Sequence, residues 1–276
     1  MEDSKDKQFY EKPAIVRHST NSVNRFGQFA GSVPHPTIDG VPVRELVEAY
    51  GSPLWVVSEG TLRRKYKDMY RAFSLRYPRV AIAYSYKTNY LSGICAIFHQ
   101  EGAWAEVVSG FEYDIATGLK VPGPNIIFNG PHKTPGELAR AAQMNSRINV
   151  DSYDELHLIE EIGREKSITI PVGVRLNMAV GALPWDRFGF NLENGQALDA
   201  CRRVMASSHL RLAGLHVHLG TFITDVNAYR WMAEQVASFC LHLSSEPGLA
   251  LEYIDIGGGY ASRNTLHYQW MPAQYT

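Results

Sequence analysis

The chain has 276 residues, a length that allows one large domain or two modest ones. Lys and Arg number 27 and Asp and Glu number 28, so the formal net charge is -1. This balance argues against a nucleic-acid-binding protein, whose phosphate contacts need a surplus of basic residues. No apolar run approaches the ~18 residues of a membrane-spanning helix, and the charged start of the chain has no apolar signal-peptide core.

The three cysteines, Cys95, Cys201 and Cys240, are widely spaced, odd in number and fit no metal-binding pattern. We expect them to be free thiols in a reducing compartment. Together with the charge balance, this predicts a cytoplasmic protein that binds neither nucleic acid nor a membrane, and no metal site.

The N-terminal part reads as irregular. Residues 1–36 form a polar arm that ends in the break Ser32–Pro36, and residues 37–57 are expected to be extended. A helix is predicted from Ser58 or Thr61 to about Phe73, because apolar residues recur there on one stripe.

After Pro78 the sequence alternates between short apolar runs and helix-length amphipathic stretches. The predicted strands are Val80–Tyr86, Trp104–Val108, Asn125–Phe128, Arg147–Val150, Ile168–Leu176, Leu210–Leu219 and Leu251–Ile256. The predicted helices between them are Leu91–Gln100, Glu112–Leu119, Gly136–Met144, Tyr153–Ile162, Gly195–Ala206 and Asn227–Leu243. Continuous apolar strands separated by helices indicate parallel βα units that are buried on both faces.

Consecutive units of this kind predict an α/β fold, a (β/α)8 barrel of the TIM type, over residues 58–276. An open dinucleotide-binding sheet is the weaker alternative, since no Gly-x-Gly-x-x-Gly opens the first helix. Only seven strands are found before Thr276, so we expect the barrel to lack its eighth strand and to be part of a longer polypeptide.

Polar residues recur at the carboxyl ends of the predicted strands, where such barrels carry their chemistry. The residues are Lys87, Glu106, Asn129, Asp151, Arg175, Asn177, His216, His218 and Asp255, with Gly257–Gly259 after the last strand. Ionisable groups inside apolar strands are costly unless they are paired or in use. A ring of them at one end of the barrel predicts a site.

Each residue also has a structural explanation. Lys87 could be an exposed lysine, and Glu106 with Arg175 could form a buried ion pair. His216 and His218 share one face of a strand and could be half of a zinc site or core residues, but no further ligands stand at metal-like spacing. Together these residues predict a pyridoxal 5'-phosphate site. The set contains a lysine, a histidine, an ion pair and a glycine loop that can bind a phosphate.

Five ordered motifs carry a resemblance to a known family. They are Tyr84–Asn89, Glu106–Glu112, Ile148–Ser152, Gly214–Thr221 and Ile254–Gly259. In order and spacing these motifs resemble the fold-type III pyridoxal phosphate-dependent decarboxylases, which act on ornithine, arginine or diaminopimelate. Within the family, the residues of these motifs are most similar to those of the diaminopimelate enzymes, especially from Gly214 onward. The fold implied is the alanine racemase-like barrel.

The resemblance implies roles for individual residues. Lys87 would form the Schiff base and His218 would stack on the pyridine ring, both as catalytic residues. Thr221 and Gly257, Gly258 and Gly259 would lie near the phosphate. Glu106 and Arg175 would lie beneath or beside the cofactor and fix the histidine and the ring. Glu112 would support the loop that follows its strand, and His216 would be structural.

The family resemblance also implies an activity and an assembly. The activity is decarboxylation of an amino acid, with meso-diaminopimelate to L-lysine as the first expectation, in a homodimer with a shared active site. Residues 37–57 would join a C-terminal β domain. That domain, and the acid that distinguishes decarboxylases from racemases of the same fold, would lie past Thr276. A racemase, and a silent relative that binds a partner decarboxylase or only the cofactor, therefore remain open.

Overall fold

The computed structural model describes residues 36–180, 187–244 and 249–261. The chain divides into two compact units, residues 1–56 and residues 57–276. Almost all of the predicted polar arm lies outside the described residues.

The described part of the first unit is a small hairpin followed by a helix. Strands β1 (Thr37–Ile38) and β2 (Val41–Pro42) pair antiparallel, and α1 (Val43–Tyr50) follows directly. The expectation of an extended segment over residues 37–57 is therefore wrong at α1. This helix is short, but the Arg44–Glu48 ion pair, 2.8 Å long and one turn apart, supports it.

The second unit is built on one parallel sheet, as the alternating pattern predicted. Its strands are β3 (Ala83–Ser85), β4 (Trp104–Val107), β5 (Ile126–Phe128), β6 (Arg147–Val150), β7 (Ile170–Asn177), β8 (Phe190–Asn191), β9 (Leu210–Val217) and β10 (Tyr253–Asp255). Seven of them lie in the order β10-β9-β7-β6-β5-β4-β3, and all neighbouring pairs are parallel. All seven predicted strands are confirmed. The short β8, which pairs with the end of β7, was not predicted.

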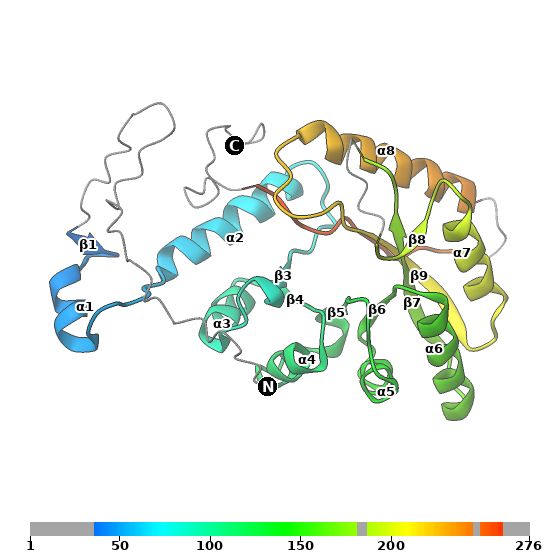
Figure 1. Ribbon diagram of the computed structural model, residues 1–276, viewed down its shortest axis with the longest axis horizontal. Helices are drawn as coiled ribbons and strands as arrows, with labels where there is room; N and C mark the ends of the chain where they lie inside the picture. Colours follow the sequence, from blue (N-terminus) through cyan, green and yellow to red (C-terminus); the bar gives the residue numbers. More distant parts are fainter. Residues whose placement is uncertain (1–35, 181–186, 245–248, 262–276) are drawn as a thin grey trace, which may run out of the picture. The chain divides into compact units, whose positions relative to one another are not determined.

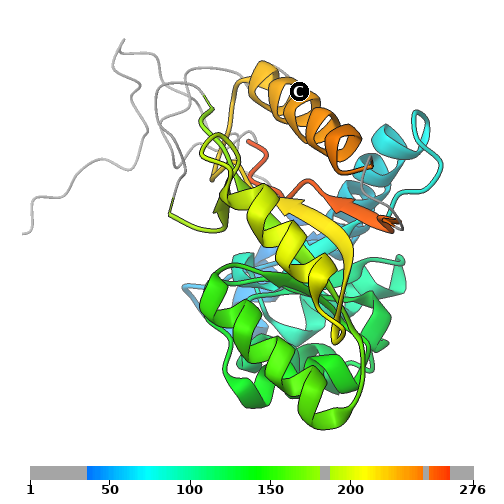
Figure 2. The same cartoon turned by 90° about the vertical axis from the view of Figure 1, so that its right-hand side faces the viewer.

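The helices cover the outside of this curled sheet. They are α2 (Glu59–Ser74), α3 (Ser92–Gln100), α4 (Gly110–Gly118), α5 (Pro135–Gln143), α6 (Tyr153–Lys166), α7 (Gln196–Ala206) and α8 (Val226–Leu243). Figure 1 shows α3, α4, α5 and α6 following one another around the row of strands. In Figure 2, α7 (yellow-green) lies in front of β9 (yellow).

Hydroxyl side chains begin several of these helices. Ser109, Thr134 and Ser152 accept hydrogen bonds from the backbone of α4, α5 and α6 respectively. Each cap lies a few residues after a strand, so the chain turns from strand to helix over a short loop at the carboxyl end of the sheet. These loops carry the polar residues that the sequence singled out.

The curled parallel sheet with helices outside confirms the predicted barrel class. Among the described residues, β3 and β10 are the first and last strands of the row and do not pair with each other. In the part of the chain that was searched, no helix combines the length and the apolar character needed to cross a membrane.

A buried ion pair fixes the loops after β5 and β6. The fully buried Lys133 ammonium lies 2.6 Å from Glu155 Oε1 and also donates to the carbonyls of Gly130 and Asn149. Glu155 Oε2 accepts from the Asp151 N–H at 2.7 Å. Burial lowers the pKa of Lys133 and raises that of Glu155, while each charge opposes this shift in the other.

We predict that Lys133→Met lowers the free energy of unfolding by about 3 kcal/mol or more, because it leaves the Glu155 carboxylate buried without its cation. Urea unfolding of the full chain measures this loss. The double variant Lys133→Met/Glu155→Leu serves as the control and is expected to lose less than the sum of the single variants. A loss below about 1 kcal/mol for Lys133→Met would contradict this account.

Candidate active site at the carboxyl ends of the strands

Lys87 and Glu106 meet at the carboxyl ends of β3 and β4. Lys87 lies in η1 (Tyr86–Thr88), the single turn that follows β3, and Glu106 lies inside β4. Lys87 Nζ is 3.7 Å from Glu106 Oε1. The Lys87 side chain is 47% exposed, whereas that of Glu106 is 11% exposed. The amine therefore faces open space above a carboxylate that is almost fully enclosed.

The Glu106 carboxylate is held from two further sides. Asn129 Nδ2 donates to Oε1 at 3.1 Å, and the Ser85 hydroxyl donates to Oε2. The alternative of a Glu106–Arg175 ion pair is wrong. Arg175 Nη1 instead donates to Asp151 Oδ1 at 2.8 Å. The two residues meet because Asp151 follows Val150 on β6, Arg175 follows Val174 on β7, and Val150 and Val174 are paired in the sheet.

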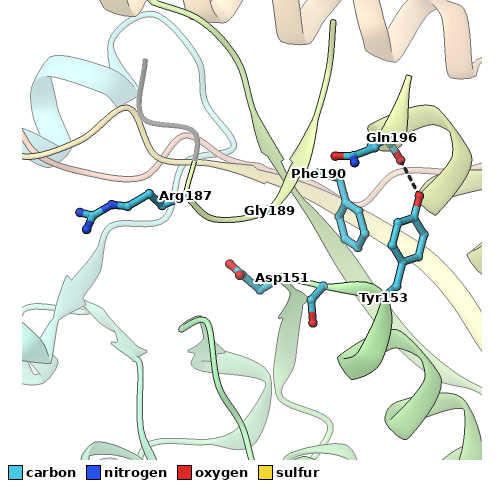
Figure 3. Close-up of a pocket in the computed structure, with 7 residues that line it drawn as sticks. Asp151, Tyr153, Arg187, Gly189, Phe190 and Gln196 are labelled. Atoms are coloured by element: carbon cyan, nitrogen blue, oxygen red, sulfur yellow. Dashed lines mark hydrogen bonds between the residues drawn. The ribbon is translucent and has the colours of Figure 1, made fainter. Parts of the chain in front are cut away.

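The Arg175–Asp151 pair is buried, with side chains that are 9% and 7% exposed. The guanidinium also lies over the ring of Phe188, 5.0 Å from its centroid. Asp151 lines a pocket of about 260 Å³ with Ser152, Tyr153, Arg187, Gly189, Phe190 and Gln196. In Figure 3 the Arg187 side chain points away from the Phe190 and Tyr153 rings of this pocket.

A chain of hydrogen bonds crosses the interior of the barrel behind Glu106. Asn149 Nδ2 donates to Asn129 Oδ1 at 2.7 Å and to Asp255 Oδ2 at 3.3 Å. The Tyr253 hydroxyl donates to Asn149 Oδ1 at 2.7 Å. Asn149 thus links the carboxylate beside Lys87 to Asp255 on β10, although 106 positions of sequence separate Asn149 from Asp255.

Sequence reasoning missed Asn149 and Tyr253 as parts of this site. Tyr253 fits inside the barrel because Gly214 faces it, where a Cβ would meet the tyrosine ring at 2.3 Å. A Cβ on Gly173 would likewise meet Asn149 Oδ1 at 2.1 Å. Glycines inside two buried strands, β7 and β9, were the available signal, since they mark places where a large side chain approaches.

Asp255 connects this chain to the histidines and to the glycine loop. His216 Nδ1 lies 3.0 Å from Asp255 Oδ2, and the Gly257 N–H donates to Oδ1 at 2.9 Å. Burial acts to raise the pKa of the Asp255 carboxyl, but the His216 charge and the hydrogen bonds outweigh burial and lower that pKa to about 2. The carboxylate is therefore ionised at neutral pH.

His218 is held as a neutral ring. Its Nδ1 accepts a hydrogen bond from the Gly258 N–H at 3.3 Å. Burial, and next the positive charge of Lys87, lower its pKa to about 4. Arg175 acts in the same direction more weakly, so the charges of Lys87 and Arg175 both reach His218. In the sheet Arg175 is paired with His216, two residues before His218, so the predicted arginine and histidines lie at neighbouring strand ends.

The glycine loop after β10 has two different kinds of glycine. Gly257 and Gly259 have positive φ angles of 68° and 81°, and a Cβ on Gly259 would meet the Gly220 carbonyl at 1.9 Å. Gly258 has no positive φ, and no described atom lies within 4 Å of the position of its Cβ. The described packing does not require glycine at Gly258, which leaves open space at that point of the loop.

The remaining predicted residues lie close by. Thr221 is exposed, between Gly220 and Phe222, and the Ile223 N–H donates to the Gly259 carbonyl at 2.8 Å, so this loop runs beside the glycine loop. Glu112 Oε2 accepts from the Val108 N–H at 2.8 Å and supports the turn after β4, as predicted. Within the described ranges, no three His, Cys, Asp or Glu side chains gather as a metal would need.

Fold and site together define a class: a parallel βα barrel with a lysine and a glycine loop at the carboxyl ends of its strands. The chain belongs to the pyridoxal-dependent decarboxylase family, and residues 59–273 match the model of the family's pyridoxal binding domain.

Individual relatives agree with this assignment. The chain is 33% identical over 236 residues to a diaminopimelate decarboxylase of Methanocaldococcus jannaschii, covering 80% of this chain and 54% of that protein. It is 30% identical over 258 residues to one of Bacillus subtilis, covering 90% and 57%. The crystal structure of the M. jannaschii enzyme in complex with L-lysine superposes with a TM-score of 0.77 at 32% identity, covering 82% and 55%. The chain spans about half the length of the curated relatives it matches.

We predict unequal stability effects for alanine substitution at two neighbouring glycines. Gly259→Ala should lower the melting temperature by several degrees, on the order of 4 °C or more, because its Cβ meets the Gly220 carbonyl and its φ is positive. Gly258→Ala should leave the melting temperature within about 1 °C. Differential scanning calorimetry of both variants tests this difference, and equal losses in the two would refute it.

We also predict that His218 titrates far below free histidine. Proton NMR of the ring should give a pKa near 4 instead of 6.5. Because the unfolded chain binds this proton first, the stability tied to His218 is complete above about pH 6.5 and is lost as the pH falls toward 4. His218→Gln should flatten the stability profile in this window, and a profile identical to that of the wild type would count against the buried neutral ring.

Proposed function

We propose that the chain is the cofactor-binding part of a pyridoxal phosphate-dependent amino-acid decarboxylase that converts meso-diaminopimelate to L-lysine. The observation that carries this proposal is the Lys87 amine, open on one side and 3.7 Å from the enclosed Glu106 carboxylate at the barrel mouth. Residues 58–276 would form the cofactor-binding barrel domain.

The residues present fit the cofactor. Gly258 leaves open space in the glycine loop, at a position where the packing of the described residues does not require glycine. A loop of this kind, after a late strand of a βα barrel, suits a phosphate group. When bound, pyridoxal phosphate supplies an electron sink for the bonds at the α-carbon of an amino acid.

The chain's own residues would hold and orient that group. The Lys87 amine would hold the cofactor's aldehyde covalently, and the Glu106 carboxylate beside it would keep a positive charge near the strand end. His218, neutral at pH 7, would offer a flat ring for stacking. Arg175, fixed by Asp151 and Phe188, would place a permanent positive charge at the same mouth. Thr221 would complete the phosphate side.

The substrate assignment rests on the relatives. Both the M. jannaschii and the B. subtilis relatives are diaminopimelate decarboxylases, and the M. jannaschii structure holds L-lysine. L-Lysine is the product that loss of one carboxyl group from diaminopimelate leaves. This chemistry favours a decarboxylase over the racemase and over the silent relative.

A second copy of the chain would complete the site in a cytoplasmic homodimer. Tyr90, just after η1, and Phe111, in the first turn of α4, pack edge to face at 5.4 Å. They are 50% and 61% exposed, and Leu91 beside them is 59% exposed. One of these exposed aromatic side chains follows Lys87 in the sequence, and the other lies at the start of α4. Their exposure supports an interface at this rim.

The proposed activity is tested with the full chain and added pyridoxal phosphate. We expect carbon dioxide and L-lysine from meso-diaminopimelate, and at least about tenfold less carbon dioxide from L-ornithine or L-arginine at equal concentration. Lys87→Ala should abolish the release. Interconversion of D- and L-alanine without carbon dioxide would support the racemase instead, and turnover of none of these substrates would overturn the proposal.

A further inference from the structure

Tyr229 contacts the middle of the glycine loop from outside the barrel. It lies in the first turn of α8, after the N-cap Asp225, and its hydroxyl donates to the Gly258 carbonyl at 3.1 Å. The ring is held separately, because it stacks on Tyr260 with centroids 4.9 Å apart and planes at 20°. The hydroxyl and the ring of Tyr229 can therefore be examined independently.

Only some of the backbone N–H and carbonyl groups in the glycine loop have hydrogen-bond partners among the described residues. The Gly257 N–H donates to Asp255 and the Gly258 N–H donates to His218 Nδ1. The Gly259 carbonyl accepts from the Ile223 N–H. Within the part of the chain that the structure describes, the Gly259 N–H has no acceptor. Among the described residues, the Gly259 N–H is therefore the glycine N–H of this loop that can donate to a ligand.

The Gly258 carbonyl and the Gly259 N–H belong to one planar peptide group. In a trans peptide these two groups point in opposite directions. A hydrogen bond that fixes the carbonyl on the α8 side therefore fixes the N–H on the other side. Because glycines flank this peptide, it would otherwise rotate easily. Donation to the carbonyl also polarises the peptide, which strengthens the N–H as a donor.

We propose that Tyr229 is a positioning residue that aims the Gly259 N–H at the phosphate of the cofactor. This inference rests on the proposed function, since it assumes that the glycine loop holds the phosphate. Tyr229 itself touches the peptide and not the phosphate. Its hydroxyl should therefore matter for ligands with a phosphate group and hardly for ligands without one.

The experiment compares pyridoxal phosphate with pyridoxal, which lacks the phosphate. Dissociation constants for both aldehydes are measured by equilibrium dialysis for the full-length wild type and for Tyr229→Phe, which keeps the stacked ring and loses the hydroxyl. We expect the variant to bind pyridoxal phosphate about tenfold more weakly, the value of one hydrogen bond, and pyridoxal within about twofold of the wild type. Each ligand is compared with itself, so differences between the two aldehydes cancel.

A matched control removes a tyrosine hydroxyl elsewhere. Tyr113 on α4 is buried, and its hydroxyl forms a 2.7 Å hydrogen bond with Ser146. Tyr113→Phe therefore loses a buried hydrogen bond without touching the loop, and both dissociation constants should stay within about twofold of the wild type. Melting temperatures and far-ultraviolet circular dichroism of the three proteins confirm that each is folded.

The outcomes separate this inference from the function it rests on. If the wild type prefers pyridoxal phosphate and Tyr229→Phe keeps that preference unchanged, the positioning role is refuted while the proposed function stands. Equal weakening of both ligands in Tyr229→Phe would also refute it, since that indicates a general structural role. Binding of neither aldehyde by the folded wild type would overturn the proposed function, and this inference with it.

Discussion

The site depends on the pairing of buried charges inside the barrel. Glu106 lies on β4, the second strand from one end of the row, and Asp255 lies on β10 at the other end. Both need hydrogen bonds because an unpaired buried carboxylate is strongly unfavourable. Asn149 reaches both, through Asn129 to Glu106 and directly to Asp255. A single amide in the middle strand thus connects the lysine side of the site with the side that carries the histidines and the glycine loop.

The same constraint explains the arrangement of the loops. Buried polar groups fix these loops: Lys133, in the loop after β5, pairs with Glu155 in the first turn of α6, and Asp255 at the end of β10 accepts from the Gly257 N–H in the loop that follows it. Because parallel strands place all these loops at one edge, satisfying the buried groups also sets the positions of the exposed ones. Lys87, the exposed amine of this set, is placed by Glu106, which is itself held by Ser85 and Asn129.

The sequence predicted the barrel well because its signal is local. Apolar runs such as Arg147–Val150 and Leu210–Leu219 predict buried strands from their own residues, and some of the helices begin at a hydroxyl cap, as α6 does at Ser152. Partners across the barrel were not predictable in this way. The pairing of Arg175 with Asp151 depends on which strands are neighbours, and the contacts of Asn149 with Asp255 and of Tyr229 with Gly258 depend on the curl of the whole sheet. The short helix α1 was missed because eight residues carry too little periodic signal.

Covalent trapping on the protein tests whether Lys87 binds the aldehyde of the cofactor. The full chain is incubated with pyridoxal phosphate, reduced with borohydride, digested and mapped by mass spectrometry. We expect one modified lysine, Lys87, and loss of the modification when excess pyridoxamine phosphate competes for the site. Modification spread over exposed lysines such as Lys67, with none concentrated at Lys87, would contradict the account.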